Sequence, residues 1–207
     1  MEINSTQNME QSILDAAEKL FLEKGFDSTS TTQIAKAVGC NQALVHYYFR
    51  TKDNLFNKIF ENKFKAFFSQ VFDIQGLSKM NFLDKIKHIV EKHFDLLLEN
   101  PKLPMLILNE LSRKKQNMDK LRESLHFYPE QLYAVINAEL QTEIEAGRVR
   151  NITFMDVLIT MISLNVSLFS IFPVAAEVLQ MSEEQKKIMI NHRRAENVTV
   201  VLTYLKP

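Results

Sequence analysis

Between Gln42 and Phe49, polar and aromatic side chains fall on one side of a short helical period, opposite the apolar Val45. The residues of that outer face are Gln42, Ala43, His46 and Tyr47. The amide of Gln42 both donates and accepts hydrogen bonds, and the small Ala43 beside it allows close approach. Such a face fits the major groove of double-stranded DNA, where the first residues of a recognition helix meet base edges.

The charge around this face favours the same partner. The whole chain has 25 basic and 25 acidic side chains and a formal net charge of zero, so its total charge indicates no nucleic acid. From Ser28 to Lys52, however, there is no Asp or Glu, while Lys36, Arg50 and Lys52 give three positive charges against none. This window alone predicts attraction to a phosphate backbone.

Two short helices must position these residues. The sequence predicts one over about 31–38, preceded by hydroxyl side chains suited to an N-cap, and another that begins after Asn41 and runs to about Phe49. Gly39 suits the left-handed turn between them, and the small Ala35 permits a close helix crossing. A longer amphipathic helix over Asn8–Lys24 precedes the pair and ends at Gly25.

Over Ile13–Phe56 the chain resembles the TetR family of transcriptional regulators. The resemblance is carried by Ile13–Phe21, Gly25–Phe26, Thr32–Gly39, Tyr47–Arg50 and Lys52–Phe56. It implies an all-α fold, with a three-helix helix-turn-helix DNA-binding domain over residues 1–52 and a larger helical effector-binding and dimerisation domain over 53–207. The implied function is that of a cytoplasmic repressor that binds a palindromic operator as a homodimer and is released by a small apolar or amphipathic effector.

The resemblance also implies roles for single residues. Gln42, Ala43 and His46 would face bases. Thr32 and Tyr47 would lie at the groove edge, and Tyr48 and Lys52 would hold phosphates. His46 departs from the family pattern, which more often has Tyr there.

The remainder of the chain is predicted to be helical as well, because it has few turn residues: the whole sequence contains 4 Gly and 5 Pro. We expect helices at about 53–72, 80–99, 102–115, 119–146, 153–172 and 182–205. Breaks are expected at Pro101, Pro104, Gly147 and Pro173.

Phe and Met are concentrated after the DNA-binding motif, with 12 of 15 Phe and 7 of 9 Met beyond Lys52. Most of these side chains are expected to build the core, but flat rings and flexible thioethers also line apolar ligand cavities. By the family resemblance such a cavity would bind the effector. The candidate lining residues are Phe64, Phe68, Phe94, Leu97, Met105, Phe127, Tyr128 and Met161.

The stretch Val157–Ala176 has no charged residue and the length of a membrane-spanning helix. Several polar residues interrupt it and no basic cluster flanks it, so we interpret it as a buried helix and expect no membrane contact. Ser163, Ser167 and Ser170 form a stripe of small residues along it, which permits close helix approach. By resemblance, the last two helices would form a four-helix dimer interface that includes this stripe.

Catalysis, a cofactor and a metal are not expected. Cys40 is the only cysteine, and His88 and His93 are spaced five apart on different helix faces. The polar Met1–Gln11 does not resemble a secretory signal. Two alternatives remain open: a TetR-like DNA-binding protein without a small-molecule effector, constitutive or controlled by a protein partner, and a helical interaction module or enzyme that does not bind DNA.

Overall fold

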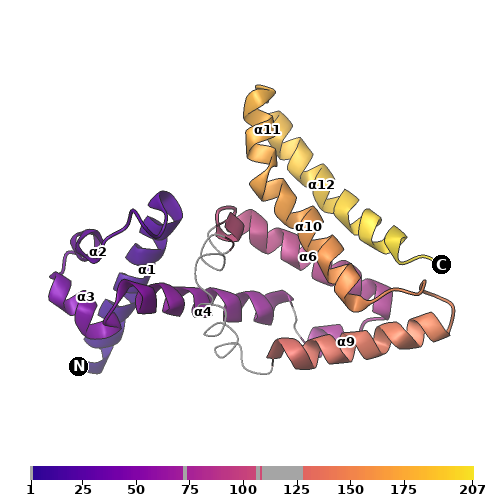
Figure 1. Cartoon of the computed structure of the whole chain (residues 1–207), viewed down its shortest axis with the longest axis horizontal. Coiled ribbons are helices and arrows are strands. Elements are labelled where there is room, and N and C mark those ends of the chain that lie inside the picture. The colour runs from indigo at the N-terminus through magenta and orange to yellow at the C-terminus, as the bar shows by residue number, and fades with distance from the viewer. Residues whose placement is uncertain (1, 72–73, 106–107, 109–127) are drawn as a thin grey trace. The chain divides into compact units, whose positions relative to one another are not determined.

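The computed structural model describes residues 2–71, 74–105, 108 and 128–207, and every regular element within those ranges is an α-helix (Figure 1). The helices are α1 (Glu2–Lys24), α2 (Thr31–Val38), α3 (Gln42–Phe49), α4 (Lys52–Val71), α5 (Ile74–Leu77), α6 (Phe82–Glu99), α9 (Tyr128–Glu145), α10 (Phe154–Ser170), α11 (Phe172–Val178) and α12 (Glu183–Tyr204). The predicted all-α fold is confirmed. The helix expected at 102–115 and the start of that expected at 119–146 lie largely outside the described residues.

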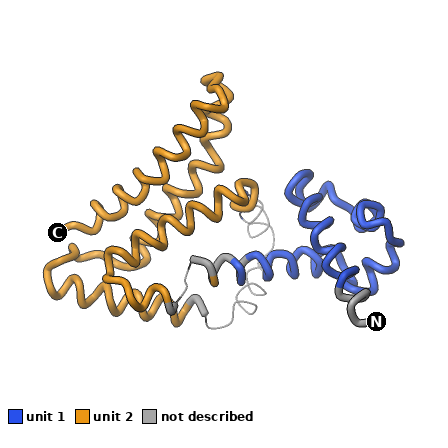
Figure 2. The backbone as a smooth tube through the Cα atoms, turned by 180° about the vertical axis from the view of Figure 1, so that it is seen from behind, with its two compact units in different colours: residues 1–66, 105–125 blue, residues 67–104, 126–207 orange. Residues whose placement is uncertain are grey.

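The chain divides into two compact units (Figure 2). The first comprises residues 1–66 and 105–125, and the second comprises residues 67–104 and 126–207. The division falls within α4. The apolar core of the first unit includes Leu55, Phe56, Ile59 and Phe60 from α4, and therefore extends past residue 52.

In the first unit, α2 packs against both α1 and α3. The buried residues of α1 are the apolar ones that recur at helical spacing, so the amphipathic pattern of the sequence becomes the inner face of the helix. Three of the core rings, those of Phe21, Phe26 and Phe56, lie with centroids 5.2 to 5.5 Å apart. These contacts give α2 and α3 a rigid base.

The ends of α2 and α3 are fixed by local hydrogen bonds. Ser30 and Gln33 form a capping box, in which the Ser30 hydroxyl accepts from the Gln33 amide and the Gln33 side chain accepts from the Ser30 amide. Gly39 ends α2 in the left-handed conformation, with φ of 78°. The Asn41 side chain then accepts from the amide of Leu44 at 2.8 Å and starts α3, as predicted.

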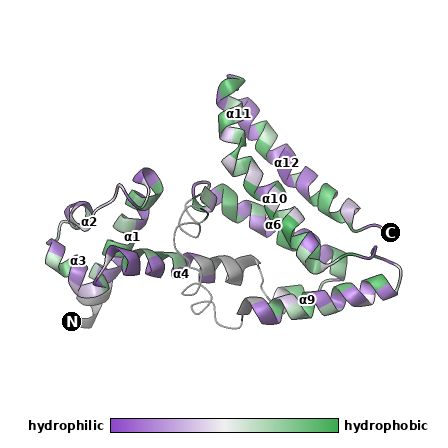
Figure 3. Cartoon of the chain, viewed as in Figure 1, coloured by the Kyte–Doolittle hydropathy of each residue, from purple (hydrophilic) through white to green (hydrophobic). Residues whose placement is uncertain are grey.

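In the second unit, α6, α10 and α12 pack against one another, and α9 packs against α6 and α10. Figure 1 shows α10 and α12 side by side with α11 at the turn between them. Their shared core contains Ile86 and Val90 from α6, Met161 from α10 and Val201 from α12. Figure 3 shows hydrophobic residues along much of α10 and α11.

The short helices α5 and α11 were not predicted. Pro173 was interpreted as the end of a helix, but it lies in the first turn of α11. A proline is tolerated there because the first amides of a helix have no partner within the helix. The break in the chain comes earlier, at Ile171, after α10 has ended at Ser170.

Candidate nucleic-acid interface

The third helix has one buried face and one exposed face. Val45 and Phe49 are buried in the core of the first unit, while Gln42, Ala43, His46 and Tyr47 are exposed. Tyr47 keeps 65% of its surface. The structure thus brings together on one outer face the residues that the sequence predicted to meet bases.

The side chain of Gln42 is held by two hydroxyls from the start of α2. Its amide nitrogen donates to Thr31 Oγ1 at 3.0 Å, and its amide oxygen accepts from Thr32 Oγ1 at 3.1 Å. These bonds use one N–H and one lone pair, and the amide retains one of each for a further partner. The sequence did not reveal this contact of Thr31, because its partner lies 11 residues further along the chain.

Tyr48 lies at the border between this face and the core. It is half-buried, packs against the core of the first unit, and meets the Tyr47 ring edge-on with centroids 5.3 Å apart. An aromatic pair of this kind restricts both rings. The predicted groove-edge and phosphate-contacting tyrosines are therefore neighbours at the C-terminal half of α3.

The turn that follows α3 is strained. Arg50 has φ of 63° and ψ of −52°, and the amide of Thr51 donates to the carbonyl of Phe49 at 2.6 Å. This is a γ-turn with positive φ, an unfavourable conformation for a residue with a Cβ. The turn leads at once into Lys52, the first residue of α4.

Lys52 does not extend into solvent as a free side chain. Its ammonium group donates to the backbone carbonyls of Phe26 and Thr29, each at 2.9 Å, and lies 4.2 Å from the centroid of the Phe26 ring. Two of its three N–H groups are thereby used. Lys36 and Arg50, the other two cations of the acid-free window, are exposed.

The candidate effector-pocket residues have varied environments. Phe94, Leu97 and Met161 are buried in the second unit, and Met105 is exposed. Phe94 packs against the ring of Phe169 with centroids 5.5 Å apart. Phe127 lies outside the described residues, and the side chains of Phe64, Phe68 and Tyr128 are not described either.

The serine stripe of α10 lies beside an exposed apolar stripe. Ser163 is exposed, whereas Ser167 and Ser170 are half-buried, and the Ser167 hydroxyl donates to the carbonyl of Leu164. The neighbouring apolar residues Met155, Ile159 and Ile162 retain 49%, 56% and 45% of their surface. The sequence predicted large apolar residues beside the small ones of this face, and the structure shows that these three are exposed.

By length and composition alone, Phe154–Val178 is apolar enough to cross a membrane. Its central residue Asn165 is fully buried and hydrogen-bonded to both α6 and α12. Its partners come from α6 and α12, and both of these helices carry many charged residues, which a membrane interior disfavours. This contact supports the interpretation of α10 as a core helix.

Asn165 belongs to a polar network that the sequence did not reveal. Its amide nitrogen donates to the carbonyl of Val90 at 3.1 Å and lies 2.9 Å from His93 Nδ1, and its oxygen accepts from the Asn197 amide at 2.8 Å. Arg193 in turn donates to the Asn197 oxygen. Burial lowers the pKa of His93 to about 4, and the ring is therefore neutral near pH 7.

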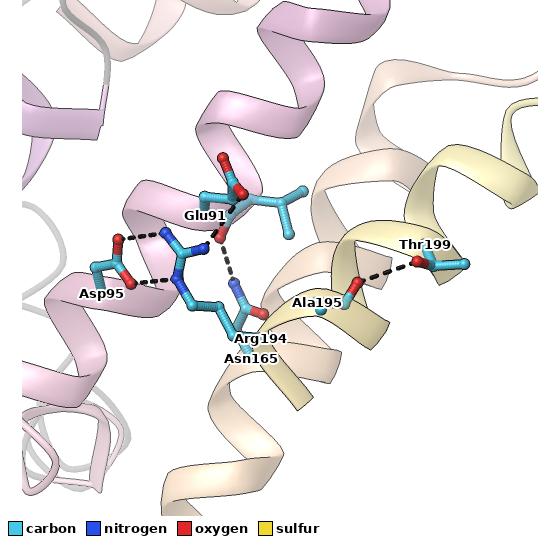
Figure 4. A network of polar contacts seen from close by, with 7 residues as sticks. Glu91, Asp95, Asn165, Arg194, Ala195 and Thr199 are labelled. Atoms are coloured by element: carbon cyan, nitrogen blue, oxygen red, sulfur yellow. Dashed lines mark hydrogen bonds and ion pairs between the residues drawn. The ribbon is translucent and has the colours of Figure 1, made fainter. Parts of the chain in front are cut away.

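A second polar contact joins the same helices nearer the surface. The guanidinium of Arg194 on α12 donates to both oxygens of Asp95 and to Glu91 on α6 (Figure 4). This pairing lowers the pKa of Asp95 and raises that of Arg194. Figure 4 also shows Asn165 bonded beside this pair, so α6 is tied to both α10 and α12.

Comparison with known proteins places this arrangement in a family. The family described as bacterial regulatory proteins, tetR family, matches residues 13–59. The chain is 27% identical over 140 residues to a fatty acid metabolism regulator protein of Bacillus subtilis, a match that covers 65% of this chain and 70% of that one. It is 29% identical over 126 residues to the biofilm operon negative transcriptional regulator IcaR of Staphylococcus epidermidis, which covers 57% of this chain and 65% of the relative.

The fold matches over nearly the whole chain. A putative fatty acid metabolism regulator of Clostridium perfringens superimposes with a TM-score of 0.70 at 18% identity and covers 95% of this chain and 99% of that chain. The match to the family falls on the helices that carry the candidate interface, and the relatives are transcriptional regulators. These findings support a TetR family transcriptional regulator: residues 13–59 match the family in sequence, and nearly the whole chain matches in fold.

Proposed function

We propose that this protein represses transcription by binding a palindromic operator as a homodimer, and that a small apolar or amphipathic molecule releases it. The observation that carries the proposal is the outer face of α3, where Gln42, Ala43 and His46 are exposed at the start of a helix whose opposite face is anchored in the core. No acidic residue lies between Ser28 and Lys52 to repel phosphates. Thr32 and Tyr47 would border the groove, and Tyr48 would hold a phosphate.

Dimerisation is supported by the exposed stripe of α10. An apolar stripe that contains Ile159 and lies beside Ser163 is unfavourable in water, and covering it with a second copy removes that cost. Ser167 and Ser170 border the same face. Because one recognition helix reads half a site, a two-fold dimer would place two helices in successive major grooves, about 34 Å apart.

An effector is supported by the aromatic and thioether content of the second unit. Phe94, Leu97 and Met161, which are buried in that unit, would contribute to an apolar cavity. The names of the Bacillus and Clostridium proteins refer to fatty acid metabolism. Long-chain fatty acids are therefore the first molecules to test.

The test of DNA recognition begins with footprinting of the protein on the DNA upstream of its own gene. Gln42→Ala should then weaken binding to the protected site by about 1–3 kcal/mol and leave binding to random duplex nearly unchanged, because base contacts carry sequence information. The exposed Gln141 on α9 provides the matched control, and Gln141→Ala should leave both affinities unchanged. Equal losses on both duplexes for Gln42→Ala would refute base reading.

The dimer is tested by placing a charge on the exposed stripe. Ile159→Arg should convert the dimer to a monomer in sedimentation and abolish operator binding, because the interface would bury an unpaired charge. Val135→Arg on α9 changes an apolar residue of similar exposure, 57% against 56%, and should do neither. Added fatty acid should weaken operator binding by the wild-type dimer; if no tested molecule does so while operator binding is intact, the effector part of the proposal fails.

A further inference from the structure

The ammonium group of Lys52 is bonded within the protein and does not extend into solvent, where a phosphate-binding lysine would lie. Its ammonium group donates to two backbone carbonyls, those of Phe26 and Thr29, at 2.9 Å each. The same nitrogen lies 4.2 Å from the centroid of the Phe26 ring, where a cation is attracted to the aromatic face. Lys52 is half-buried, so this arrangement is partly protected from water.

The two carbonyls belong to a turn with a defined shape. The amide of Thr29 donates to the carbonyl of Phe26 at 3.2 Å, and the Thr29 hydroxyl donates to the carbonyl of Gly25 at 2.9 Å. Thr29 keeps only 1% of its surface. The next residue, Ser30, is the N-cap of α2, so this turn determines where α2 begins.

Lys52 itself stands just after the end of α3. The γ-turn at Arg50 separates it from Phe49, the last residue of that helix. The ammonium group therefore connects the segment that leads into α2 with the segment that leaves α3, across 23 and 26 residues of sequence. These two hydrogen bonds therefore join the turn before α2 to the residue that follows α3.

We propose that Lys52 is a positioning residue for DNA recognition: by joining these two segments it fixes the tilt of α3, and hence the direction in which Gln42 and His46 point. This inference rests on the proposed operator binding and replaces the phosphate contact that the family resemblance implies for Lys52. A tilt error would misplace base contacts, while phosphate contacts made by flexible side chains would persist.

The two roles predict different changes in DNA binding. Lys52→Met keeps an unbranched apolar stem over Phe26 but removes all three N–H donors. If Lys52 is a positioning residue, the Lys52→Met protein should bind the operator at least tenfold more weakly than the wild type. Its affinity for random duplex and the salt dependence of its binding should be unchanged. As a phosphate contact, it would weaken both duplexes equally and lower the salt slope by about one. That second result would overturn the proposal.

Two further variants complete the experiment. Lys52→Arg retains a cation with several donors and should restore part of the ratio of operator to random-duplex affinity. Lys36→Met, in the same acid-free window but exposed on α2, removes a cation without touching the turn and should leave that ratio unchanged.

Hydrogen exchange provides a readout that needs no DNA. The amide of Thr29, protected by its bond to the Phe26 carbonyl, should exchange faster in Lys52→Met than in the wild type, and at the wild-type rate in Lys36→Met. Unchanged exchange of the Thr29 amide in Lys52→Met would contradict the proposal that Lys52 holds this turn in place. If the wild type bound no upstream site, the proposed function would fail, but the exchange experiment would still test the role of Lys52 in the turn.

Discussion

The two compact units bury polar groups in different ways. In the first unit, the buried polar residue among those described is Thr29, whose hydroxyl bonds to the carbonyls of nearby Gly25 and Leu20. In the second unit, Asn165 and Asn197 are fully buried and bond to each other from different helices, 32 residues apart. Polar burial is local in the DNA-binding unit and crosses between helices in the other.

The network of the second unit has a direction. Arg193 can only donate, so the Asn197 oxygen must be its acceptor, and the Asn197 nitrogen then donates to Asn165. The Asn165 nitrogen is left to donate to Val90 and to His93 Nδ1. His93 must therefore carry its proton on Nε2, and the two ends of the network, the Arg193 donor and the Val90 acceptor, require the same amide orientations.

This difference has a structural consequence. Apolar helix faces can slide by a turn at modest cost, whereas a buried amide that loses its partners is expensive. The network should therefore fix the register of α6, α10 and α12. In the first unit aromatic rings fill the core, and the long-range contact of Lys52 is only half-buried. The predictions below test this contrast, from the largest expected effect to the smallest.

The largest effect should come from Asn165→Leu, which makes the core of the second unit more apolar but removes the centre of the network. The Asn197 amide and His93 Nδ1 would lose their partner, and the free energy of unfolding should fall by about 3–4 kcal/mol. Urea unfolding followed by circular dichroism measures the loss.

Two variants frame that result. Thr29→Val removes the buried hydroxyl of the first unit and should cost only about 1 kcal/mol, because its bonds are local. Asn191→Leu, on the exposed face of α12, should cost almost nothing. Were Asn165→Leu as stable as the wild type, the network would contribute no net stability, and the contrast between the units would be refuted.

The next effect is a pH dependence that originates in the second unit. The pKa of His93 is lowered from 6.5 to about 4 by burial, so the unfolded chain binds a proton near pH 6.5 while the folded chain stays neutral until about pH 4. Between these values the unfolded state holds more protons, and the free energy of unfolding should fall by about 2–3 kcal/mol as the pH is lowered through this window. It should not fall further from this residue below pH 4.

Comparison of variants isolates this contribution from that of the carboxylates. His93→Gln should remove the His93 part of the slope between pH 6.5 and 4, and the difference from wild type in urea unfolding at each pH measures it. His192→Gln changes an exposed histidine on α12 and should reproduce the wild-type slope. A His93→Gln protein with the full wild-type slope would disprove the assignment.

The same contrast explains what the sequence could predict. The helix-turn-helix was predicted with its boundaries because the signals are local: Ser30, Asn41 and Gly39 each act within four residues of a helix end. The outer face of α3 followed from its helical period.

The remainder depended on contacts between distant residues. Asn165 was interpreted only as a polar interruption of an apolar stretch, because its partners lie 32 and more residues away. The family resemblance implied a phosphate contact for Lys52, and its bonds to two carbonyls could not be predicted because these belong to a turn that composition does not reveal. The predicted break at Pro173 was wrong for a different reason. Proline occurs both after the end of a helix and in its first turn, and here it lies in the first turn of α11.

The smallest predicted effect concerns the strained turns, where the two units can be compared residue for residue. Arg50 in the first unit and Gln180 in the second have positive φ, 63° and 51°. Glycine adopts this region without the steric cost of a Cβ, and the relief outweighs the entropy that glycine loses on folding, so Arg50→Gly and Gln180→Gly should each raise the free energy of unfolding by about 0.5–1 kcal/mol. Arg50→Ala removes the same charge but keeps the Cβ, and it should give no gain. Thermal unfolding of the variants side by side measures these differences.

The same variants also differ in their expected DNA affinity. Since Arg50 is exposed in the acid-free window, Arg50→Gly should bind DNA less tightly than the wild type while being more stable, whereas Gln180→Gly should gain stability alone. Equal stability of Arg50→Gly and Arg50→Ala would show that the turn after α3 holds no strain that glycine relieves.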